Sequence, residues 1–420
     1  MKKLCFTINC LILIILCNGQ TLNRLYNHTF PNIDSPNPKI VDMLDNVKTD
    51  EISADVDHLS SYINRRCDGS HIYDVKDWLV GQYHSFGFDS IYLHDFPVMS
   101  CWDTIPKPFT TAPNVIAIQV GRTKPDEIII CGAHYDSWVR AEEPYDVDTL
   151  VSPGADDNAT GVAGILATAR ILSNYEFERT IYYACWNAEE VGLCGSYNFA
   201  KDCYHDSVDI VAYFNLDMTG YLNTGDDIHI HLLYNNCDSL LGKFVKQVSH
   251  TYLPEVSICQ AWLPHGVTDY SSFNRNGYQA ISPSEDVHNI SPYIHTVEDI
   301  VGLSVNNWEQ TAVFTKLNLA SVAHAAGIIS ESVDENYLDE VNIYPNPAKD
   351  YIYIDLNSQV IDNHISYYEI VDILGRKTLH GNLWNNMEEI RVSDLVSGVY
   401  IIKFYNRKGS VLTNKIFVKY

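Results

Sequence analysis

The sequence is poor in positive charge. It has 28 lysine and arginine residues against 53 aspartate and glutamate residues, which gives a formal net charge of −25. A protein that binds nucleic acid needs a basic face to neutralise phosphates, so this balance argues against nucleic acid as a partner. Carboxylates are, on the other hand, ligands that zinc and calcium ions accept.

Long apolar runs are missing after the first twenty residues. The N-terminus carries Lys2 and Lys3, a short apolar stretch from Leu11 to Leu16, and small residues at Cys17 and Gly19. This order is typical of a signal peptide cleaved after Gly19, and the apolar stretch is too short to remain as a bilayer anchor. We therefore expect residues 1–19 to be a signal peptide and the exported mature chain to lack a transmembrane anchor.

Several common catalytic motifs are absent. The sequence contains no HExxH helix, no GxSxG turn and no CxxC pair, so it lacks the residues of the corresponding zinc proteases, serine hydrolases and dithiol oxidoreductases. Eight of the eleven cysteines remain after the signal peptide, and export permits disulfides. Sequence does not fix connectivity, and the candidate pairs are Cys67 with Cys101 and Cys194 with Cys203.

Apolar runs bounded by turn residues begin at Asn114 and predict strands buried on both faces. Helical stretches alternate with them, at Thr160 to Ser173 and at Asn306 to Gly327. This alternation predicts an α/β fold, a three-layer sandwich around a mostly parallel sheet. The predicted strands are Val115–Val120, Ile128–Cys131, Ile181–Trp186, Ile210–Leu216 and Gln279–Ile281.

The last eighty residues have a different pattern. Residues 331–340 are acidic and read as a linker. After them come short β-rich runs separated by turns, which predict a small all-β sandwich over residues 341–420. The predicted strands there are Tyr351–Leu356, Tyr367–Ile373, Val399–Tyr405 and Lys415–Val418.

Polar side chains follow successive predicted strands of the α/β segment. Two adjacent carboxylates, Glu189 and Glu190, directly follow a buried strand, where their mutual repulsion requires compensation. Ligands of an open α/β sheet bind at the carboxyl ends of its strands, so these side chains are expected to share one rim. The other polar groups in question are His134, Asp136, Asp217, Asp286, His288, His295 and the loop Pro153–Gly161.

Two interpretations of these residues remain open at this point. Each taken singly is most simply a solvated side chain, and Asp156 to Asn158 could merely cap the helix that begins near Thr160. Their recurrence after successive strands favours a metal site instead, and the mixture of histidine and carboxylate suits Zn²⁺.

Five short motifs surround these residues: His134-Tyr-Asp136, Gly154-Ala-Asp-Asp-Asn-Ala-Thr-Gly161, Asn187-Ala-Glu-Glu190, Asn215-Leu-Asp217 and Ile294-His295-Thr296. In order and spacing they resemble those of the M28 family of di-zinc aminopeptidases. The resemblance runs from about Asn114 to Gly327, and it implies a zinc exopeptidase-like fold within a peptidase domain of residues 20–330.

The resemblance implies a role for each residue. Asp157 would bridge two Zn²⁺ ions, with His134 and Asp217 completing one site and Glu190 and His295 completing the other. Glu189 would be the general base, Asp136 would hold the second ring nitrogen of His134, and the peptide bond between Asp157 and Asn158 would be cis. Peptide or protein N-termini would be the substrate.

The β-rich segment contains Asn342-Ile-Tyr-Pro-Asn-Pro347, Ile373-Leu-Gly-Arg376, Leu395 to Tyr400 and a Lys-rich end, Lys415 to Lys419. Together these motifs resemble the type A sorting domain of type IX secretion. It implies the type IX machinery as a partner and, in a bacterium, passage through the periplasm to the surface or the medium. An accessory carbohydrate-binding sandwich is the alternative.

Two other functions use the same fold. A glutaminyl cyclase would bind one zinc ion, and a non-catalytic surface protein would have lost a ligand or Glu189. The complete ligand set favours the metallo-aminopeptidase. The loop Cys259–Phe273 is expected to shape the pocket for the first residue of the substrate, with Trp262 and Tyr270 either lining it or packing in the core.

Overall fold

The computed structural model describes residues 28–99, 108–109, 111–141, 145–235, 238–263, 268–329, 341–356, 365–383, 385, 387–405 and 411–420. The predicted signal peptide and the predicted linker lie outside these residues. Within the described ranges, no helix combines the length and the apolar character that crossing a bilayer requires.

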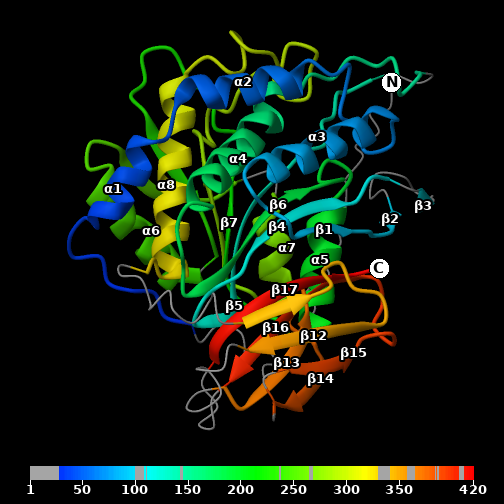
Figure 1. Cartoon of the computed structure of the whole chain (residues 1–420). Coiled ribbons are helices and arrows are strands. Elements are labelled where there is room, and N and C mark those ends of the chain that lie inside the picture. The colour runs from blue at the N-terminus through cyan, green and yellow to red at the C-terminus, as the bar shows by residue number, and fades with distance from the viewer. Residues whose placement is uncertain are drawn as a thin grey trace, which may run out of the picture.

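An eight-stranded mixed sheet forms the centre of the larger unit (Figure 1). Strands β6, β5, β7 and β10 are neighbours and run parallel, whereas β4 is antiparallel to β6 and β8 is antiparallel to β10. In spatial order the strands are β1 (Ile91–His94), β4 (Asn114–Gln119), β6 (Arg179–Trp186), β5 (Lys124–His134), β7 (Asp209–Asn215), β10 (Ala280–Ser284), β8 (His229–Leu233) and β9 (Ser257–Ala261).

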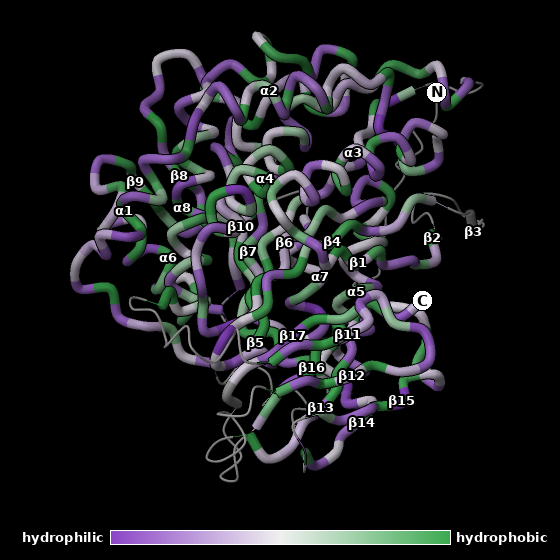
Figure 2. Tube along the Cα trace, in the orientation of Figure 1, coloured by the Kyte–Doolittle hydropathy of each residue, from purple (hydrophilic) through white to green (hydrophobic). Residues whose placement is uncertain are grey.

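The central strands are buried on both faces because their apolar residues alternate between two cores. In β5, Ile129 and Cys131 belong to the first hydrophobic cluster, on one face of the sheet, and Ile128 and Ile130 belong to the second, on the other face. Successive side chains of a strand point to opposite faces, so a continuous apolar run serves two layers at once. Figure 2 shows this hydrophobic character along the middle of the sheet.

Helices cover both faces of the sheet, which confirms the predicted three-layer sandwich (Figure 1). One face carries α1 (Pro38–Asp45), α2 (Thr49–Ser60), α3 (His71–Ser85), α4 (Gly161–Leu172), α6 (Ser239–Tyr252) and α8 (Trp308–Ala326). The other face carries α5 (Cys194–His205) and α7 (Tyr270–Arg275). A two-stranded ribbon, β2 (Val98–Met99) with β3 (Pro108–Phe109), lies apart from the main sheet.

Helix α8 begins and ends where its sequence signals predict. The side chain of Asn307 accepts a hydrogen bond from the Gln310 N–H, and Gly327 closes the helix with a φ of 74°. An Asn N-cap and a left-handed Gly after the last turn satisfy main-chain groups that the helix leaves unpaired.

The C-terminal unit is all β, as predicted, with two antiparallel sheets around a core of its own. One sheet contains β11 (Val341–Tyr344), β12 (Tyr351–Leu356) and β15 (Met387–Arg391). The other contains β14 (Lys377–Asn382), β13 (Tyr367–Asp372), β16 (Gly398–Tyr405) and β17 (Val411–Lys419).

The β unit also packs against the larger unit. Leu374 lies in the second hydrophobic cluster of the α/β sandwich, and the Tyr182 hydroxyl donates to the main-chain carbonyl of Ile373. Arg376 Nη1 lies 3.0 Å from Asp206 Oδ2. A cavity of about 720 Å³ remains between this region of the β unit and β1. The contact is therefore specific but incompletely packed.

The predicted disulfide between Cys194 and Cys203 is not formed. Cys203 is a free buried thiol, so it does not pair with Cys194. Both residues lie in α5, nine positions apart, which separates their Cα atoms by roughly 13 Å, whereas a disulfide needs less than about 7 Å. Cys67 is also a free buried thiol, and its predicted partner Cys101 lies outside the described residues.

Candidate metal centre

The structure brings the five predicted ligands to one rim of the sheet. His134 is the last residue of β5, Glu190 follows β6, and Asp217 follows β7. Asp157 lies in η2 (Ala155–Thr160), an irregular turn that leads into α4, and His295 lies in the loop after β10. Parallel strands present their carboxyl ends at the same edge, which is why residues so distant in sequence meet.

Asp157 lies between the two histidines, one oxygen toward each. Its Oδ1 is 3.1 Å from His134 Nε2, and its Oδ2 is 3.2 Å from His295 Nε2. On the first side, Asp217 Oδ1 is 3.4 Å from His134 Nε2. On the second side, Glu190 Oε2 is 3.0 Å from His295 Nε2. The five side chains thus form two groups of three that share Asp157.

The turn that carries Asp157 departs from helical geometry. Its φ and ψ are −106° and 89°, and the peptide bond to Asn158 is cis, as the family resemblance implies. Two positions of the Gly154–Gly161 segment require glycine because a side chain would not fit there. A Cβ on Gly154, whose φ is 55°, would lie 2.6 Å from Ser137 Cβ, and one on Gly161 would collide with the Asn158 side chain.

Two carboxylates hold the backbone of the ligand-bearing turns. Asp136 accepts from the main-chain N–H groups of Glu189 and Glu190, at 3.0 and 3.2 Å. Asp299 accepts in the same way from Asp156 and Asp157, at 2.9 and 3.1 Å. Each carboxylate therefore fixes the orientation of a pair of side chains through their peptide groups.

The contact between Asp136 and His134 differs in part from the expectation. His134 Nδ1 lies 3.1 Å from the main-chain carbonyl of Asp136 and 3.5 Å from its carboxylate. The carbonyl accepts the Nδ1 proton, because the carboxylate is turned toward Glu189 and Glu190. Residue 136 thus still holds the second ring nitrogen and leaves Nε2 facing Asp157 and Asp217.

Backbone strain is concentrated beside the site. Ala188, Met218 and His295 have φ values of 60°, 55° and 58°, although none is glycine. Such residues cost free energy and are kept where surrounding contacts impose them, which is common at functional sites. Trp138 packs edge-on against the His295 ring with centroids 5.0 Å apart, and it fixes the ring of this most exposed ligand.

The site concentrates negative charge in a buried place. Burial raises the pKa of Glu189 well above its usual value and that of Glu190 to about 7. Burial alone would lower the pKa of His134, yet the Asp217 and Glu189 carboxyls raise it well above the ordinary range. In the absence of a cation, the histidines are thus driven to carry the compensating protons.

Arg65 is a buried residue behind the centre that no sequence motif indicates. Its side chain is fully buried, and its guanidinium donates to the main-chain carbonyls of Leu59, Tyr135, Pro153 and Gly154. Burial lowers the pKa of Arg65 to about 10, against the opposing influence of the nearby carboxylates. The residue places a permanent positive charge behind the site and joins the β5 end to the Asp157 loop. Arg65 follows no predicted strand, so no local signal identified it.

Asp269 was also missed. Burial raises its pKa to about 7, and His134, Asp217 and Asp136 are among the groups that influence it. It begins α7 as the N-cap residue, yet its side chain makes no capping hydrogen bond. Besides burial, the negative charge of Asp269 raises the pKa of the Glu189 carboxyl.

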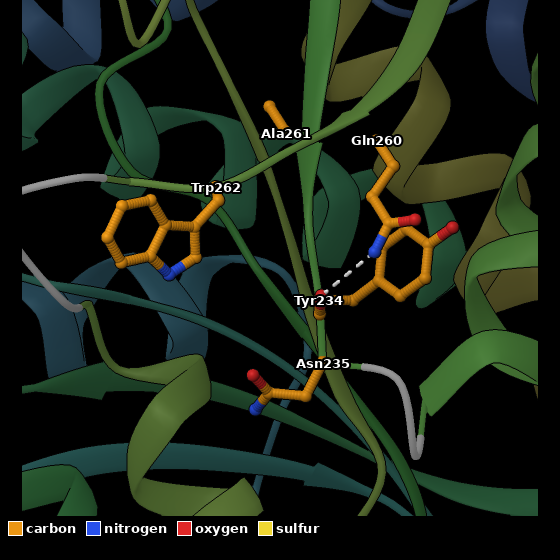
Figure 3. Close-up of a pocket in the computed structure, with 5 residues that line it drawn as sticks. All are labelled: Tyr234, Asn235, Gln260, Ala261 and Trp262. Atoms are coloured by element: carbon orange, nitrogen blue, oxygen red, sulfur yellow. Dashed lines mark hydrogen bonds between the residues drawn. The ribbon is translucent and has the colours of Figure 1, made fainter.

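The two aromatic residues of the predicted pocket loop have different environments. Tyr270 is buried in the second hydrophobic cluster, so it is a packing residue. Trp262 is 73% exposed and lines a cavity of about 420 Å³ with Tyr234 and Gln260 at the ends of β8 and β9 (Figure 3). Because β8 is antiparallel to β10 and β10 runs parallel to β7, the carboxyl ends of β8 and β9 lie at the sheet edge opposite to the candidate centre. The cavity beside Trp262 is therefore not part of the rim that carries the five predicted ligands.

The residues of the centre fit divalent metal ions. Three carboxylates and two imidazoles are N and O ligands of the kind zinc takes, and each group of three leaves open positions. Asp217 Oδ1 is buried and accepts no hydrogen bond among the described residues. His134, Asp157 and Glu190 also present ligand atoms within 4.8 Å of one another. Divalent cations bound here would offset the free-energy cost of burying these carboxylates, which the surrounding protein groups do not fully compensate.

Comparison with known families gives two matches. Residues 114–321 match the model of peptidase family M28. Residues 342–419 match the model of a secretion system C-terminal sorting domain. The first match lies within the α/β sandwich, and the second spans the β unit.

Relatives with curated names include fungal leucine aminopeptidases. The chain is 32% identical over 195 residues to a probable leucine aminopeptidase of Arthroderma otae, which is 45% of this chain and 50% of that protein. It is 25% identical over 297 residues to leucine aminopeptidase 1 of Fusarium vanettenii, covering 67% and 71%. The chain thus spans about half the length of the relatives to which it is 30% or more identical.

Solved structures with the same fold include peptidases and a cyclase. LapB from Legionella pneumophila is 25% identical with a TM-score of 0.59, over 71% of this chain and 78% of that one. A glutaminyl cyclase from Bacteroides thetaiotaomicron is 18% identical with a TM-score of 0.51, over 66% and 97%. The second likeness concerns the fold alone.

Proposed function

Because residues 114–321 belong to peptidase family M28, we propose that this chain is an exported metallo-aminopeptidase that removes N-terminal residues from peptides. The observation that carries the proposal is the position of Asp157, with one oxygen toward His134 and the other toward His295. That arrangement is suited to two ions sharing one carboxylate. We therefore propose two Zn²⁺ ions per chain, held by His134, Asp157, Asp217, Glu190 and His295.

Zinc bound at these residues would supply Lewis acid chemistry, polarising the scissile carbonyl and making a water molecule easier to deprotonate. Glu189 is the general base that takes the proton of the attacking water and delivers it to the leaving amine. Asp136 keeps Glu189 and Glu190 in their separate orientations through its two main-chain hydrogen bonds.

The proposed route of export combines the two ends of the chain. Residues 1–19 would direct the chain to the periplasm, and the sorting domain would engage type IX secretion for passage to the surface or the medium of a bacterium. The catalytic residues all precede the predicted linker, so the β unit contributes transport rather than chemistry.

Removal and return of metal tests the proposed activity. We expect a chelator to abolish hydrolysis of aminoacyl-nitroanilides and added Zn²⁺ or Co²⁺ to restore it, with two ions per chain at full activity. Elemental analysis of the same samples measures the metal. Full hydrolysis by protein shown to contain no metal would rule out the proposal.

A glutaminyl cyclase of the same fold is the alternative, and a non-catalytic binding protein is a further one. A substrate panel that includes peptides with N-terminal glutamine separates them, because a cyclase releases ammonia while leaving the chain length unchanged. The peptidase proposal requires release of free amino acids, and cyclisation without such release would replace it.

A further inference from the structure

A second group of histidine and carboxylate side chains lies outside the candidate metal centre. His229, His231 and Asp286 each offer a ligand atom, and these atoms lie within 4.8 Å of one another. His229 Nε2 is 3.9 Å from Asp286 Oδ2, and His231 Nδ1 is 3.5 Å from Asp286 Oδ1. None of the three residues belongs to the proposed catalytic set.

Strand pairing explains why these side chains meet. His229 and His231 are two residues apart in β8, so they point to the same face of the sheet. β8 is antiparallel to β10 with His231 opposite Ser284. Continuing that register by two residues places Asp286 opposite His229, on the same face. The two histidines are thus fixed on one face by the strand, and Asp286 reaches them from the first residues after β10, which ends at Ser284.

The hydrogen bonds of the two imidazoles indicate which ring nitrogens carry no proton. His229 Nδ1 lies 3.0 Å from the main-chain carbonyl of Asp227 and donates to it, which leaves the Nε2 lone pair on the side of Asp286. His231 Nδ1 accepts the main-chain N–H of Val287 at 3.1 Å. A nitrogen that accepts this N–H carries no proton, so His231 is not a protonated partner of Asp286.

Metal-binding histidines commonly have this second contact, since a main-chain carbonyl that accepts one ring N–H fixes the tautomer and aims the other nitrogen. The relative exposures of the three side chains are 24%, 12% and 13%, so the group is partly buried yet open to solvent on one side. The ring of a fourth residue, His288, lies 5.4 Å from that of His231.

We propose that His229, His231 and Asp286 form a further binding site for a divalent transition-metal ion of the zinc class. Ligands of a tetrahedral zinc ion lie about 3.3 Å apart, since each lies about 2.0–2.2 Å from the metal. The observed 3.5 and 3.9 Å separations need only small side-chain movements, with His231 exchanging its hydrogen bond to Val287 for the ion. Two imidazoles exclude calcium and magnesium, which take oxygen ligands.

The position of the site gives it a structural consequence. Asp286 lies near the start of the loop that contains His295 and Asp299. His295 is a proposed metal ligand, and the carboxylate of Asp299 holds the Asp157 turn. An ion bound at Asp286 ties the start of this loop to β8. The ion would then stabilise the loop without taking part in the reaction.

Metal counting on the complete protein tests the site. Wild-type protein and a double variant, His229→Ala with His231→Ala, are equilibrated with the same micromolar Zn²⁺ and analysed for zinc per chain. We expect the double variant to hold one ion fewer. This difference is independent of whether the candidate metal centre is filled, so it can succeed or fail separately from the proposed peptidase activity.

A matched control removes two exposed histidines outside any cluster, His250→Ala with His380→Ala, and should hold as much zinc as the wild type. Zinc should also raise the melting temperature of an Asp286→Asn variant less than that of the wild type, because a bound ion stabilises only the state that binds it. Asp286→Asn preserves side-chain shape and serves if the double variant does not fold. Equal zinc content in the wild type and the folded site variants would overturn the proposal.

Discussion

Glu189 and Glu190 are adjacent in the chain and share the Asp136 carboxylate through their peptide N–H groups, yet their side chains have different surroundings. Glu190 Oε2 lies 3.0 Å from His295, whereas Glu189 forms no ion pair among the described residues. The held backbone explains how one carboxylate can bind metal while its neighbour remains available to move a proton.

Substitution of each glutamate should therefore give a different loss. We expect Glu189→Gln to lower kcat by roughly 10²–10⁴, the usual contribution of a general base, with zinc content unchanged. Glu190→Gln should release zinc from one site, because an amide is a weaker ligand than a carboxylate. Steady-state kinetics and elemental analysis on the same preparations measure both effects. A reversed pattern would mean that the two roles are assigned to the wrong residues.

Arg65 should matter more to stability than any surface arginine. We expect Arg65→Met to lower the free energy of unfolding by about 3–5 kcal/mol, the range found when one partner of a buried charged network is removed. The substitution leaves four main-chain carbonyls without their donor and the carboxylates without a permanent cation. Denaturant unfolding measures the loss, and Arg391→Met, on the exposed surface of the β unit, is the control. Equal stability of the two variants would contradict this account.

At the scale of elements, the packing of α6 against α8 contains a titratable contact. His324 Nε2 of α8 lies 2.9 Å from the Tyr252 hydroxyl of α6, and burial lowers the pKa of His324 to about 4. The unfolded chain takes up a proton near pH 6.5, whereas the folded protein resists it down to about pH 4. Stability from this contact is therefore present above pH 6.5 and is lost as the pH falls toward 4.

Replacing this histidine should flatten that dependence. We expect the wild type to lose about 1–2 kcal/mol more than His324→Gln between pH 7 and 4.5, a value reduced from the full shift because the side chain is partly exposed. Urea unfolding of both proteins at several pH values measures the difference. His250→Gln, an exposed change on α6, should follow the wild type, and parallel curves for His324→Gln would show that the contact is not pH-sensitive.

Which elements the sequence predicted depends on how they are buried. The sequence predicts β5, β6 and β7 because both faces of these strands are apolar, and it predicts α8 because an apolar stripe at helical spacing ends at Gly327. It does not predict β8 and β9, because polar residues interrupt the apolar run of each strand. The sequence also does not predict which strands of the sheet are antiparallel, because contacts between residues distant in sequence decide the direction of pairing.

The same distinction applies to the site. Residues that follow a strand within a motif were identifiable, and the structure brings them together. Arg65, Asp269 and Trp138 act through the tertiary fold and carry no local pattern. The second hydrogen-bonding role of Asp136, toward the glutamate backbone, likewise required the arrangement of β5 beside β6.

At the scale of the whole molecule, each unit has a core of its own, and Leu374 of the β unit packs into the second hydrophobic cluster of the α/β sandwich. The units also touch where Lys403 pairs with Asp126 and where Asn414 Nδ2 donates to the Gly121 carbonyl. We expect a chain truncated after about Glu331 to fold and retain peptidase activity, since every proposed catalytic residue precedes that point. In a bacterium with the type IX machinery, the same truncation should leave the enzyme in the periplasm. Activity is measured in the periplasmic, surface and medium fractions.

A full-length Leu374→Glu variant separates docking from sorting. It should weaken the contact between the units without deleting the sorting signal, so activity should still reach the surface. Normal delivery of the truncated chain would exclude the sorting role. An inactive purified truncation would show that the β unit belongs to the catalytic fold.

The incompletely filled contact around Leu374 has a consequence for what happens if the chain is cut between the units. While they are joined, the connection keeps the β unit at a high effective concentration beside its docking surface, so even a weak contact stays formed. After cleavage the same contact becomes an encounter between two molecules, and dilution favours their separation. The cavity of about 720 Å³ leaves this attachment incompletely packed, which suits a contact that is released by a single cut between the units.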